Sequence, residues 1–168
     1  MLSSRAMHIR EATDEDWPAI WPVVRDVLAA GETFTLPHDL PEDVAREVWM
    51  LAPPDRTVVA VDEDGALLGT AKMNRNHSGP ASHIASASFM VDPARERRGV
   101  GRALGEYALA WARAAGYRAM QFNAVVETNT RAVALWRSLG FEVMTTLPEG
   151  FDHPRHGYVG LHIMWRAL

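Results

Sequence analysis

The stretch that decides the fold is Val91-Asp92-Pro93-Ala94-Arg95-Glu96-Arg97-Arg98-Gly99-Val100-Gly101-Arg102-Ala103-Leu104. An apolar run typical of a β-strand ends at Val91, and Asp92-Pro93 stops it because proline has no N–H to donate to a sheet. After a charged turn and Gly-Val-Gly, apolar residues recur at the spacing of one helical face, at Val100, Ala103, Leu104, Tyr107, Ala108, Trp111 and Ala115. The stretch therefore predicts a strand, a glycine turn and the start of a helix.

The glycine turn favours a bound anion. The first amides of a helix lack internal partners and the helix dipole makes this end positive, while Gly99 and Gly101 let a ligand approach the backbone. In a chain of formal net charge −4, positive charge is added here by Arg95, Arg97, Arg98 and Arg102. The turn therefore predicts a phosphate or pyrophosphate site. The alternative is a solvated turn with surface arginines.

Two commoner glycine loops do not fit this stretch. A P-loop needs Gly-Lys-Ser/Thr after its spacer, and that sequence does not occur here. A dinucleotide-binding turn needs a third glycine three positions after the second, where this chain has Leu104. Neither nucleotide motif is therefore predicted.

The stretch resembles the acyl-CoA-binding motif of the GNAT superfamily of N-acetyltransferases, Arg/Gln-x-x-Gly-x-Gly/Ala. Gly99 and Gly101 occupy the glycine positions, whereas Glu96 stands where the family has Arg or Gln. The later segment 129–141 resembles a second motif of the family, Asn-x-x-Ala-x-x-Leu-Tyr-x-x-x-Gly-Phe, with Trp136 in place of the tyrosine. The resemblance implies that the loop amides, with Gly99, Val100, Gly101 and the neighbouring arginines, hold the pyrophosphate of coenzyme A.

Hydrophobic periodicity and breakers predict the element order β-α-α-β-β-β-α-β-α-β-β. Strands are expected at 8–12, 57–61, 66–73, 83–91, 117–126, 141–147 and 157–165, with helices ending near Gly31 and spanning 41–51, 101–116 and 130–139. A loop is expected at 148–155, and Pro22 predicts a kink or a late start of the first helix. The resemblance implies an α/β fold whose mixed, mostly antiparallel sheet has helices on both faces and a splayed strand pair that admits the cofactor.

Length and composition predict one globular domain. The chain has 168 residues, of which 48% are hydrophobic and 23% charged. We expect a flexible leader at 1–6 and a single domain at 7–168. The chain has no cysteine, which excludes disulfides and thiolate chemistry, and no apolar run approaches the ~20 residues of a membrane span. We therefore expect a cytoplasmic protein that binds neither membrane nor, given its negative charge, nucleic acid.

Acyl transfer to an amine needs a neutral amine, a polarised thioester carbonyl and a proton for the leaving thiolate. The resemblance implies that backbone N–H groups before the glycine loop hold the carbonyl and the pantetheine arm. By position these belong to Phe89, Met90 and Val91. The alternative is that all three are ordinary strand residues.

The catalytic candidates are Asn123, Ser86 and Glu32. The segment 122–129 resembles a GNAT subgroup that acts on proline-like cyclic amino acids, and that subgroup has a supporting asparagine where this chain has Ser86. Each candidate has a structural alternative: a hydrogen-bonded strand asparagine, a plain strand serine and a solvated loop glutamate.

Two residues of the second motif are expected to bind the cofactor. Asn129 either contacts it or only caps its helix. Trp136 cannot supply the proton that the family's tyrosine supplies, so it either packs along the cofactor arm or belongs to the core.

These features predict an N-acetyltransferase that moves the acetyl group of acetyl-CoA to the amine of a small molecule. Direct attack in a ternary complex is expected, because the chain has no cysteine nucleophile. Two alternatives stay open, a protein or peptide N-acetyltransferase and a CoA-binding regulatory module without turnover. No metal is predicted, since Pro154 separates His153 from His156 and no third ligand is evident. The resemblance allows a homodimer.

Overall fold

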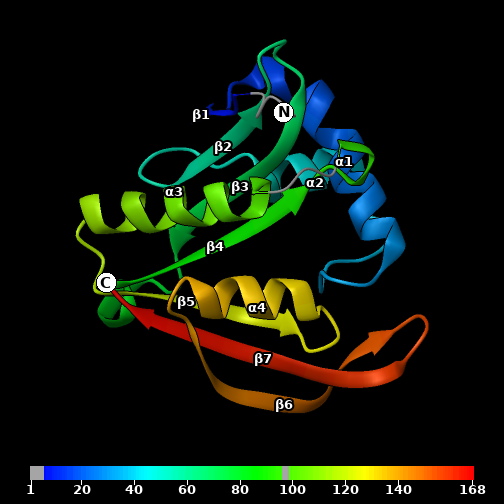
Figure 1. Cartoon of the computed structure of the whole chain (residues 1–168), viewed down its shortest axis with the longest axis vertical. Helices are drawn as coiled ribbons and strands as arrows, with labels where there is room; N and C mark the ends of the chain where they lie inside the picture. Colours follow the sequence, from blue (N-terminus) through cyan, green and yellow to red (C-terminus); the bar gives the residue numbers. More distant parts are fainter. Residues whose placement is uncertain (1–5, 96–98) are drawn as a thin grey trace, which may run out of the picture.

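The computed structural model describes residues 6–95 and 99–168, and within them seven strands form one sheet in the order β1-β2-β3-β4-β5-β7-β6 (Figure 1). The strands are β1 (His8–Glu11), β2 (Arg56–Val61), β3 (Leu67–Arg75), β4 (Ile84–Val91), β5 (Ala119–Val126), β6 (Glu142–His153) and β7 (Gly157–Ala167). The helices are α1 (Trp17–Ala30), α2 (Glu42–Trp49), α3 (Val100–Ala114) and α4 (Thr130–Ser138). Short 3₁₀ turns are η1 (Asp14–Asp16), η2 (Gly79–Ala81) and η3 (Pro93–Arg95). The predicted element order is confirmed.

The helices cover both faces of the sheet, as predicted. α3 and α4 pack on one face through a core that includes Leu104 and Trp136, and α1 and α2 pack on the other through Trp17, Ile20 and Trp49. Every strand pairing in the sheet is antiparallel except that of β4 with β5. The mixed, mostly antiparallel α/β fold is therefore confirmed.

β4 and β5 are hydrogen-bonded neighbours only at one end. Their pairing is confined to Ile84 with Ala119 and Ala85 with Met120, and beyond it the two strands diverge (Figure 1). Over 86–91 the edge of β4 that faces β5 consequently has no partner strand among the described residues. Backbone groups on such an edge need another partner, so the gap is suited to a ligand that can pair with the backbone.

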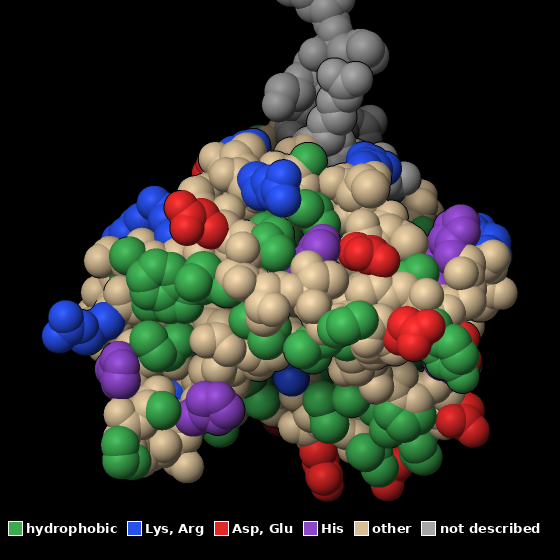
Figure 2. All heavy atoms as spheres, turned by 90° about the horizontal axis from the view of Figure 1, so that it is seen from below, with side chains coloured by type: hydrophobic (Ala, Val, Ile, Leu, Met, Phe, Trp, Pro, Cys, Tyr) green, Lys and Arg blue, Asp and Glu red, His purple; other side chains and the backbone are tan. Residues whose placement is uncertain are grey.

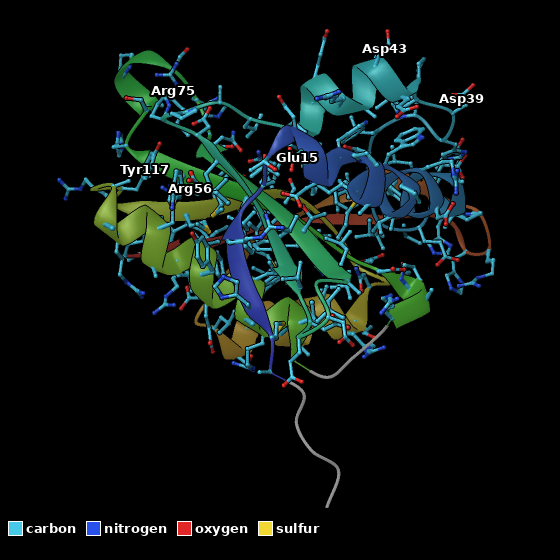
Figure 3. The ribbon with its side chains drawn as sticks, turned by 90° about the horizontal axis from the view of Figure 1, so that it is seen from above. Glu15, Asp39, Asp43, Arg56, Arg75 and Tyr117 are labelled. Atoms are coloured by element: carbon cyan, nitrogen blue, oxygen red, sulfur yellow. The ribbon has the colours of Figure 1, made fainter. Side chains whose placement is uncertain are left out.

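The end of the sheet where β4 and β5 do pair lies near Tyr117. Figure 3 shows Tyr117 with Arg56 and Arg75 on one side of the molecule and Asp39 and Asp43 on another. Burial, together with the negative charge of Asp55, raises the pKa of the Tyr117 hydroxyl.

The predicted loop at 148–155 is wrong over most of its length. β6 continues to His153, and only residues 154–156 separate it from β7. Pro148 is tolerated because β6 is the edge strand, where a missing N–H has no neighbouring strand to pair with. The register with β7 shifts between Leu147 and Phe151, which is a bulge that absorbs the proline.

The predicted late start of α1 is also wrong. α1 begins at Trp17 and continues through Pro22 to Ala30, while the kink stays a prediction. The 3₁₀ turn η1 precedes α1, and there the backbone N–H of Thr13 donates to Asp16 Oδ2 at 2.7 Å, as in a capping box. Packing of the Trp17 face against the sheet outweighs the hydrogen bond that Pro22 cannot make.

The face formed by β6 and β7 mixes charged and apolar side chains. Figure 2 shows the Lys and Arg side chains mostly toward the left and top of this view and the Asp and Glu side chains mostly toward the right and bottom, with hydrophobic side chains between them. Large exposed hydrophobic side chains in these two strands are Met144, Leu147 and Tyr158. Among the described residues, no helix is long and apolar enough to cross a bilayer.

Candidate functional site

A cleft of about 820 Å³ occupies the gap between β4 and β5. Its walls come from the end of α1, the loop between α1 and α2, strands β4 and β5, and the first turns of α3 and α4. Segments far apart in the sequence therefore meet in one hollow at the open end of the splayed strands.

The first turn of α3 forms one wall of this cleft. Gly99 has φ +91°, a left-handed conformation that favours glycine, and the first helical hydrogen bond runs from the N–H of Ala103 to the Gly99 carbonyl. The amides of Val100, Gly101 and Arg102 precede that bond, so they have no intrahelical acceptor. Gly99, Gly101 and Arg102 line the cleft, whereas the side chain of Val100 is buried in the core. Val100 can therefore contact a ligand only through its backbone, and not through its side chain.

The arginines predicted beside the turn have different surroundings. Arg97 and Arg98 lie outside the described residues. Arg102 donates through Nη2 to Ser138 Oγ at 2.6 Å and lies 3.8 Å from Glu106 Oε1. Arg102 is exposed and is one of the residues that line the cleft, which places a positive side chain near the amides of this turn.

Phe89, Met90 and Val91 all line the cleft, at the end of β4. The Met90 side chain is buried in the core under α1, and the Phe89 ring lies on the opposite face, 4.7 Å from the ring of Trp136. The side chains are thus core residues while the backbone borders the gap. The geometry is therefore compatible both with backbone contacts to a cofactor and with an ordinary role as strand residues.

Trp136 is a core residue that also forms part of the cleft wall. It is 7% exposed and packs against Phe89, Phe122 and Phe141. Asn129 caps α4, since its Oδ1 accepts from the N–H of Ala132 at 3.4 Å, and it too lines the cleft. Cofactor contacts by these two residues stay predictions.

Asn123 and Ser86 line the cleft from β5 and β4. Asn123 is exposed rather than enclosed in an apolar strand, and its side chain is hydrogen-bonded to Asn76 and Gln121. Ser86 is buried on β4, opposite Asn74 of β3. The cleft thus brings a fixed amide and a hydroxyl to opposite sides of the splayed pair.

Glu32 also lines the cleft, from the loop after α1. Its Oε1 lies 2.8 Å from Nη2 of Arg155, which belongs to the turn between β6 and β7. The ion pair joins the two halves of the molecule across the cleft. Glu32 is therefore not simply solvated, as one reading of the sequence had it.

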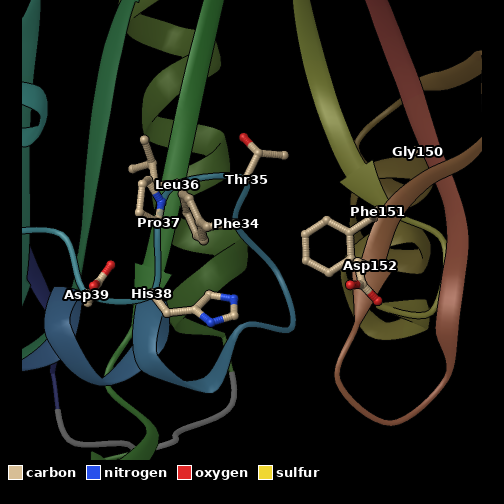
Figure 4. A pocket seen from close by; sticks show the side chains of 9 residues that line it. All are labelled: Phe34, Thr35, Leu36, Pro37, His38, Asp39, Gly150, Phe151 and Asp152. Carbon is tan, nitrogen blue, oxygen red and sulfur yellow. The ribbon is translucent and has the colours of Figure 1, made fainter.

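A second hollow, of about 730 Å³, adjoins the cleft through Phe34 and Thr35, which line both. It lies between the loop after α1 and the end of β6. Figure 4 shows His38 pointing across the gap toward Phe151, with Asp152 beside that ring. The two hollows together run from the glycine turn of α3 to the end of β6.

His153 stabilises the turn between β6 and β7 by accepting hydrogen bonds from its backbone. His153 is buried, and its Nδ1 accepts from the N–H groups of Arg155 and His156 at 3.1 and 3.3 Å. In the described ranges, 6–95 and 99–168, no group of three or more His, Cys, Asp or Glu side chains could hold a metal ion.

Sequence reasoning missed two residues of this region, Arg155 and Asn76. Arg155 follows His-Pro in what was expected to be a plain loop, and Asn76 follows the predicted end of β3. Nothing in their local sequence marks them, because each acquires its role from a distant partner, Glu32 or Asn123.

Proteins similar to this chain are acetyltransferases. The sequence model described as the acetyltransferase (GNAT) family matches residues 10–141. A solved structure of a GCN5-related N-acetyltransferase from Kribbella flavida is 55% identical, with a TM-score of 0.94 over 97% of this chain and 98% of that one. The L-methionine sulfoximine/L-methionine sulfone acetyltransferase of Pseudomonas paraeruginosa is 30% identical over 147 residues, 84% of this chain and 83% of that protein.

N-acetyltransferase aca1 of Schizosaccharomyces pombe is 32% identical over 111 residues, which are 66% of this chain and 53% of that protein. The chain therefore spans about half the length of this yeast relative.

Proposed function

The chain belongs to the acetyltransferase (GNAT) family, and from that membership we propose that it transfers the acetyl group of acetyl-CoA to the amine of a small molecule. The observation that carries the proposal is the cleft, which joins the free amides of the α3 turn to the polar groups Asn123, Ser86 and Glu32. It provides an anion site at one end and proton-handling groups at the other.

The pyrophosphate of acetyl-CoA is proposed to bind at the start of α3. Its donors are the amides of Val100, Gly101 and Arg102, assisted by the Arg102 guanidinium. The pantetheine arm then lies in the gap between β4 and β5, where it can pair with the unpaired edge of β4 as a strand would. Asn129 and Trp136 border the same path.

The acceptor nitrogen is proposed to attack the thioester carbonyl directly. A C–N bond forms as the C–S bond breaks, the amine loses a proton, and the leaving thiolate gains one from solvent. Backbone N–H groups near Phe89 to Val91, residues that line the cleft, are proposed to polarise the carbonyl. No covalent acyl-cysteine is available, since the chain has no cysteine.

Glu32 is the proposed proton acceptor. A lysine-like amine costs about 4.6 kcal/mol to deprotonate at pH 7, so a carboxylate near the incoming nitrogen is useful. Arg155 Nη2 lies 2.8 Å from Glu32 Oε1 and holds the carboxylate at the cleft. Asn123 and Ser86 would hold the acceptor or a water molecule between them.

The Glu32–Arg155 ion pair favours a small acceptor over a peptide. It ties the loop after α1 to the turn between β6 and β7, so an extended polypeptide would have to break it to lie across this end. The second hollow, between Phe34 and Phe151, can take the remainder of a compact molecule. The similar Pseudomonas protein is named for small amino-acid-like substrates, in keeping with this proposal.

The test is thiol release from acetyl-CoA in the presence of a panel of small amines, amino acids and short peptides. We expect saturable release with one class of small amine. Release with peptides alone would replace the proposal by peptide acetylation. Saturable CoA binding without release for any acceptor would favour a regulatory module.

A further inference from the structure

Three side-chain amides form a chain behind the cleft. Gln121 donates through Nε2 to Asn123 Oδ1 at 3.0 Å, and Asn123 donates through Nδ2 to Asn76 Oδ1 at 2.7 Å. Asn123 lines the cleft, whereas Asn76 and Gln121 do not. Anything these two residues do for a ligand in the cleft is therefore done through Asn123.

We infer that Asn76 and Gln121 are positioning residues that fix the orientation of the Asn123 amide, Asn76 as hydrogen-bond acceptor and Gln121 as donor. The inference rests on the proposed function, in which Asn123 faces the acceptor. An exposed asparagine amide rotates freely about its last torsion. Contacts to both ends of the amide remove that freedom and decide which end carries the oxygen.

The supports of Asn123 are themselves fixed to the sheet. The backbone N–H of Asn76 donates to the Ile84 carbonyl at 2.8 Å, which holds it beside the start of β4. Gln121 lies within the paired part of β5, opposite Trp165 of β7. Asn76 and Gln121 thus approach Asn123 from the two halves of the splayed sheet.

The hydrogen bonds to Asn76 and Gln121 leave part of the Asn123 amide available for a ligand. An asparagine amide has two N–H donors and two acceptor lone pairs. Asn76 and Gln121 use one of each on Asn123, so one N–H and one lone pair remain. The remaining pair can accept from the acceptor amine and donate to a neighbouring polar group of the same molecule.

Asn76 carries an unusual feature that fits this role. Its Nδ2 is buried and has no hydrogen-bond partner within the described residues. An unsatisfied buried donor destabilises a fold, and an aspartate would supply the same acceptor to Asn123 without the orphan donor. The acceptor of Asn76 is thus used by Asn123 while its donor is not, and Asn76→Asp keeps the used atom and removes the unused one.

The test compares matched variants at the two positions. Asn76→Asp keeps the acceptor that Asn123 needs, and Asn76→Leu removes it. Gln121→Glu removes the donor, and Gln121→Met keeps only the shape. We expect kcat/KM for the amine to fall about tenfold in Asn76→Leu, Gln121→Glu and Gln121→Met, the factor that one neutral hydrogen bond supplies. Asn76→Asp should stay within about threefold of the unmodified protein, and KM for acetyl-CoA should change in none.

A second measurement does not depend on turnover. The Asn123 side-chain amide is identified in an ¹H–¹⁵N spectrum by its loss in Asn123→Ala. The one proton that it donates to Asn76 should exchange slowly in the unmodified protein and in Asn76→Asp, and quickly in Asn76→Leu. Equal exchange in all three would overturn the inference even if no acceptor amine were found.

Two kinetic results would contradict the inference. A tenfold fall of kcat/KM in Asn76→Asp together with full activity in Gln121→Glu would show that the amide chain runs in the opposite direction. That result would overturn the assigned roles. Unmodified kinetics in all four variants would overturn positioning altogether. Absence of turnover in the unmodified protein contradicts the proposed function instead, so the two failures are distinguishable.

Discussion

At the scale of single residues, Gly99 has the backbone conformation on which the proposed anion site depends. Its φ of +91° makes an alanine there strained although nothing lies within 4 Å of a Cβ. We expect Gly99→Ala to lower the free energy of unfolding by about 1–2 kcal/mol and to weaken acetyl-CoA binding at least tenfold, because relief of strain turns the α3 amides away from the ligand. Chemical denaturation and titration calorimetry measure the two effects.

Gly116, at the other end of α3, is the matched control. Its φ is +85° and it also has nothing within 4 Å of a Cβ, but it does not line the cleft. Gly116→Ala should lose similar stability while its affinity for acetyl-CoA is unchanged. Equal loss of affinity in both variants would show that strain, and not the position of Gly99 at the site, is responsible.

The ionised carboxylate of Asp16 is expected to make the stability of the protein depend on pH in the acid range. Hydrogen bonds from Arg10 and from the Thr13 backbone hold the pKa of its carboxyl below the ordinary 3.8. Since the folded pKa is depressed, the stabilisation is fully present above pH 3.8 and is lost as the pH falls through the folded value. Asp16→Asn weakens the hydrogen bonds from Arg10 and Thr13 to the carboxylate and should therefore cost about 1 kcal/mol of unfolding free energy at neutral pH, and the difference should shrink in acid.

Urea unfolding from pH 7 to pH 2 tests this, with Asp14→Asn as control. The Asp14 side chain is 89% exposed, and within the described part of the chain its one ion pair is with Arg46 at the surface, so its removal should change stability by less than about 0.5 kcal/mol. A difference between Asp16→Asn and the unmodified protein that is constant with pH would contradict the assigned ionisation.

Residue types and spacing were sufficient to predict the glycine turn and to give a helix cap as one of two roles for Asn129, because both features are local. They were insufficient for Glu32, whose partner Arg155 comes from the opposite end of the chain. The sequence also could not show that Asn123 is exposed and clamped, since the splay of β4 from β5 opens that part of the strand. Long-range pairing decides the chemistry of these polar groups.

At the scale of elements, the contact between α3 and α4 depends on Gly105. A Cβ there would lie 2.9 Å from Leu139 Cδ1 and 2.9 Å from Trp136 Cζ3. The Trp136 ring is held by Phe89 and Phe122 and has little room to move. We expect Gly105→Ala to destabilise the fold by about 1–2 kcal/mol, because overpacking of about 1–3 kcal/mol exceeds the helix-propensity gain of about 1 kcal/mol.

Guanidinium unfolding of Gly101→Ala provides the comparison. A Cβ at Gly101 meets only the flexible tip of Leu135, at 3.3 Å, so the propensity gain should offset the contact and stability should change little. If Gly105→Ala proved as stable as the unmodified protein, the two helices would have to be less tightly packed than the structure indicates.

Element boundaries were predictable where breakers coincide with the end of burial, as at Gly31 after α1. They were not predictable at Pro148. A proline in an isolated sequence indicates a loop, but the strand order places β6 at the edge, where a bulge accommodates it. Only the position of a strand in the sheet decides whether its proline is tolerated, and a sequence without tertiary contacts lacks that information.

At the scale of the whole molecule, the sheet consists of two halves joined narrowly. Among the described residues, the strand pairing between the half from β1 to β4 and the half from β5 to β7 is limited to Ile84 with Ala119 and Ala85 with Met120. The Glu32–Arg155 ion pair adds one exposed contact at the far end. A ligand that spans the cleft should therefore contribute to cohesion between the halves as well as occupy a site.

Acetyl-CoA should accordingly raise the thermal unfolding temperature. At a hundredfold excess over Kd, binding to the native state alone adds about 2.7 kcal/mol, which for a chain of 168 residues corresponds to a rise of roughly 5–10 °C. Pantetheine lacks the pyrophosphate and should give a much smaller rise at the same concentration, and Gly99→Ala should show a reduced rise with acetyl-CoA. Scanning fluorimetry over a concentration series measures all three. A rise with pantetheine equal to that with acetyl-CoA would place the binding energy outside the α3 turn, and no rise with either compound would remove the physical basis for acyl transfer in this cleft.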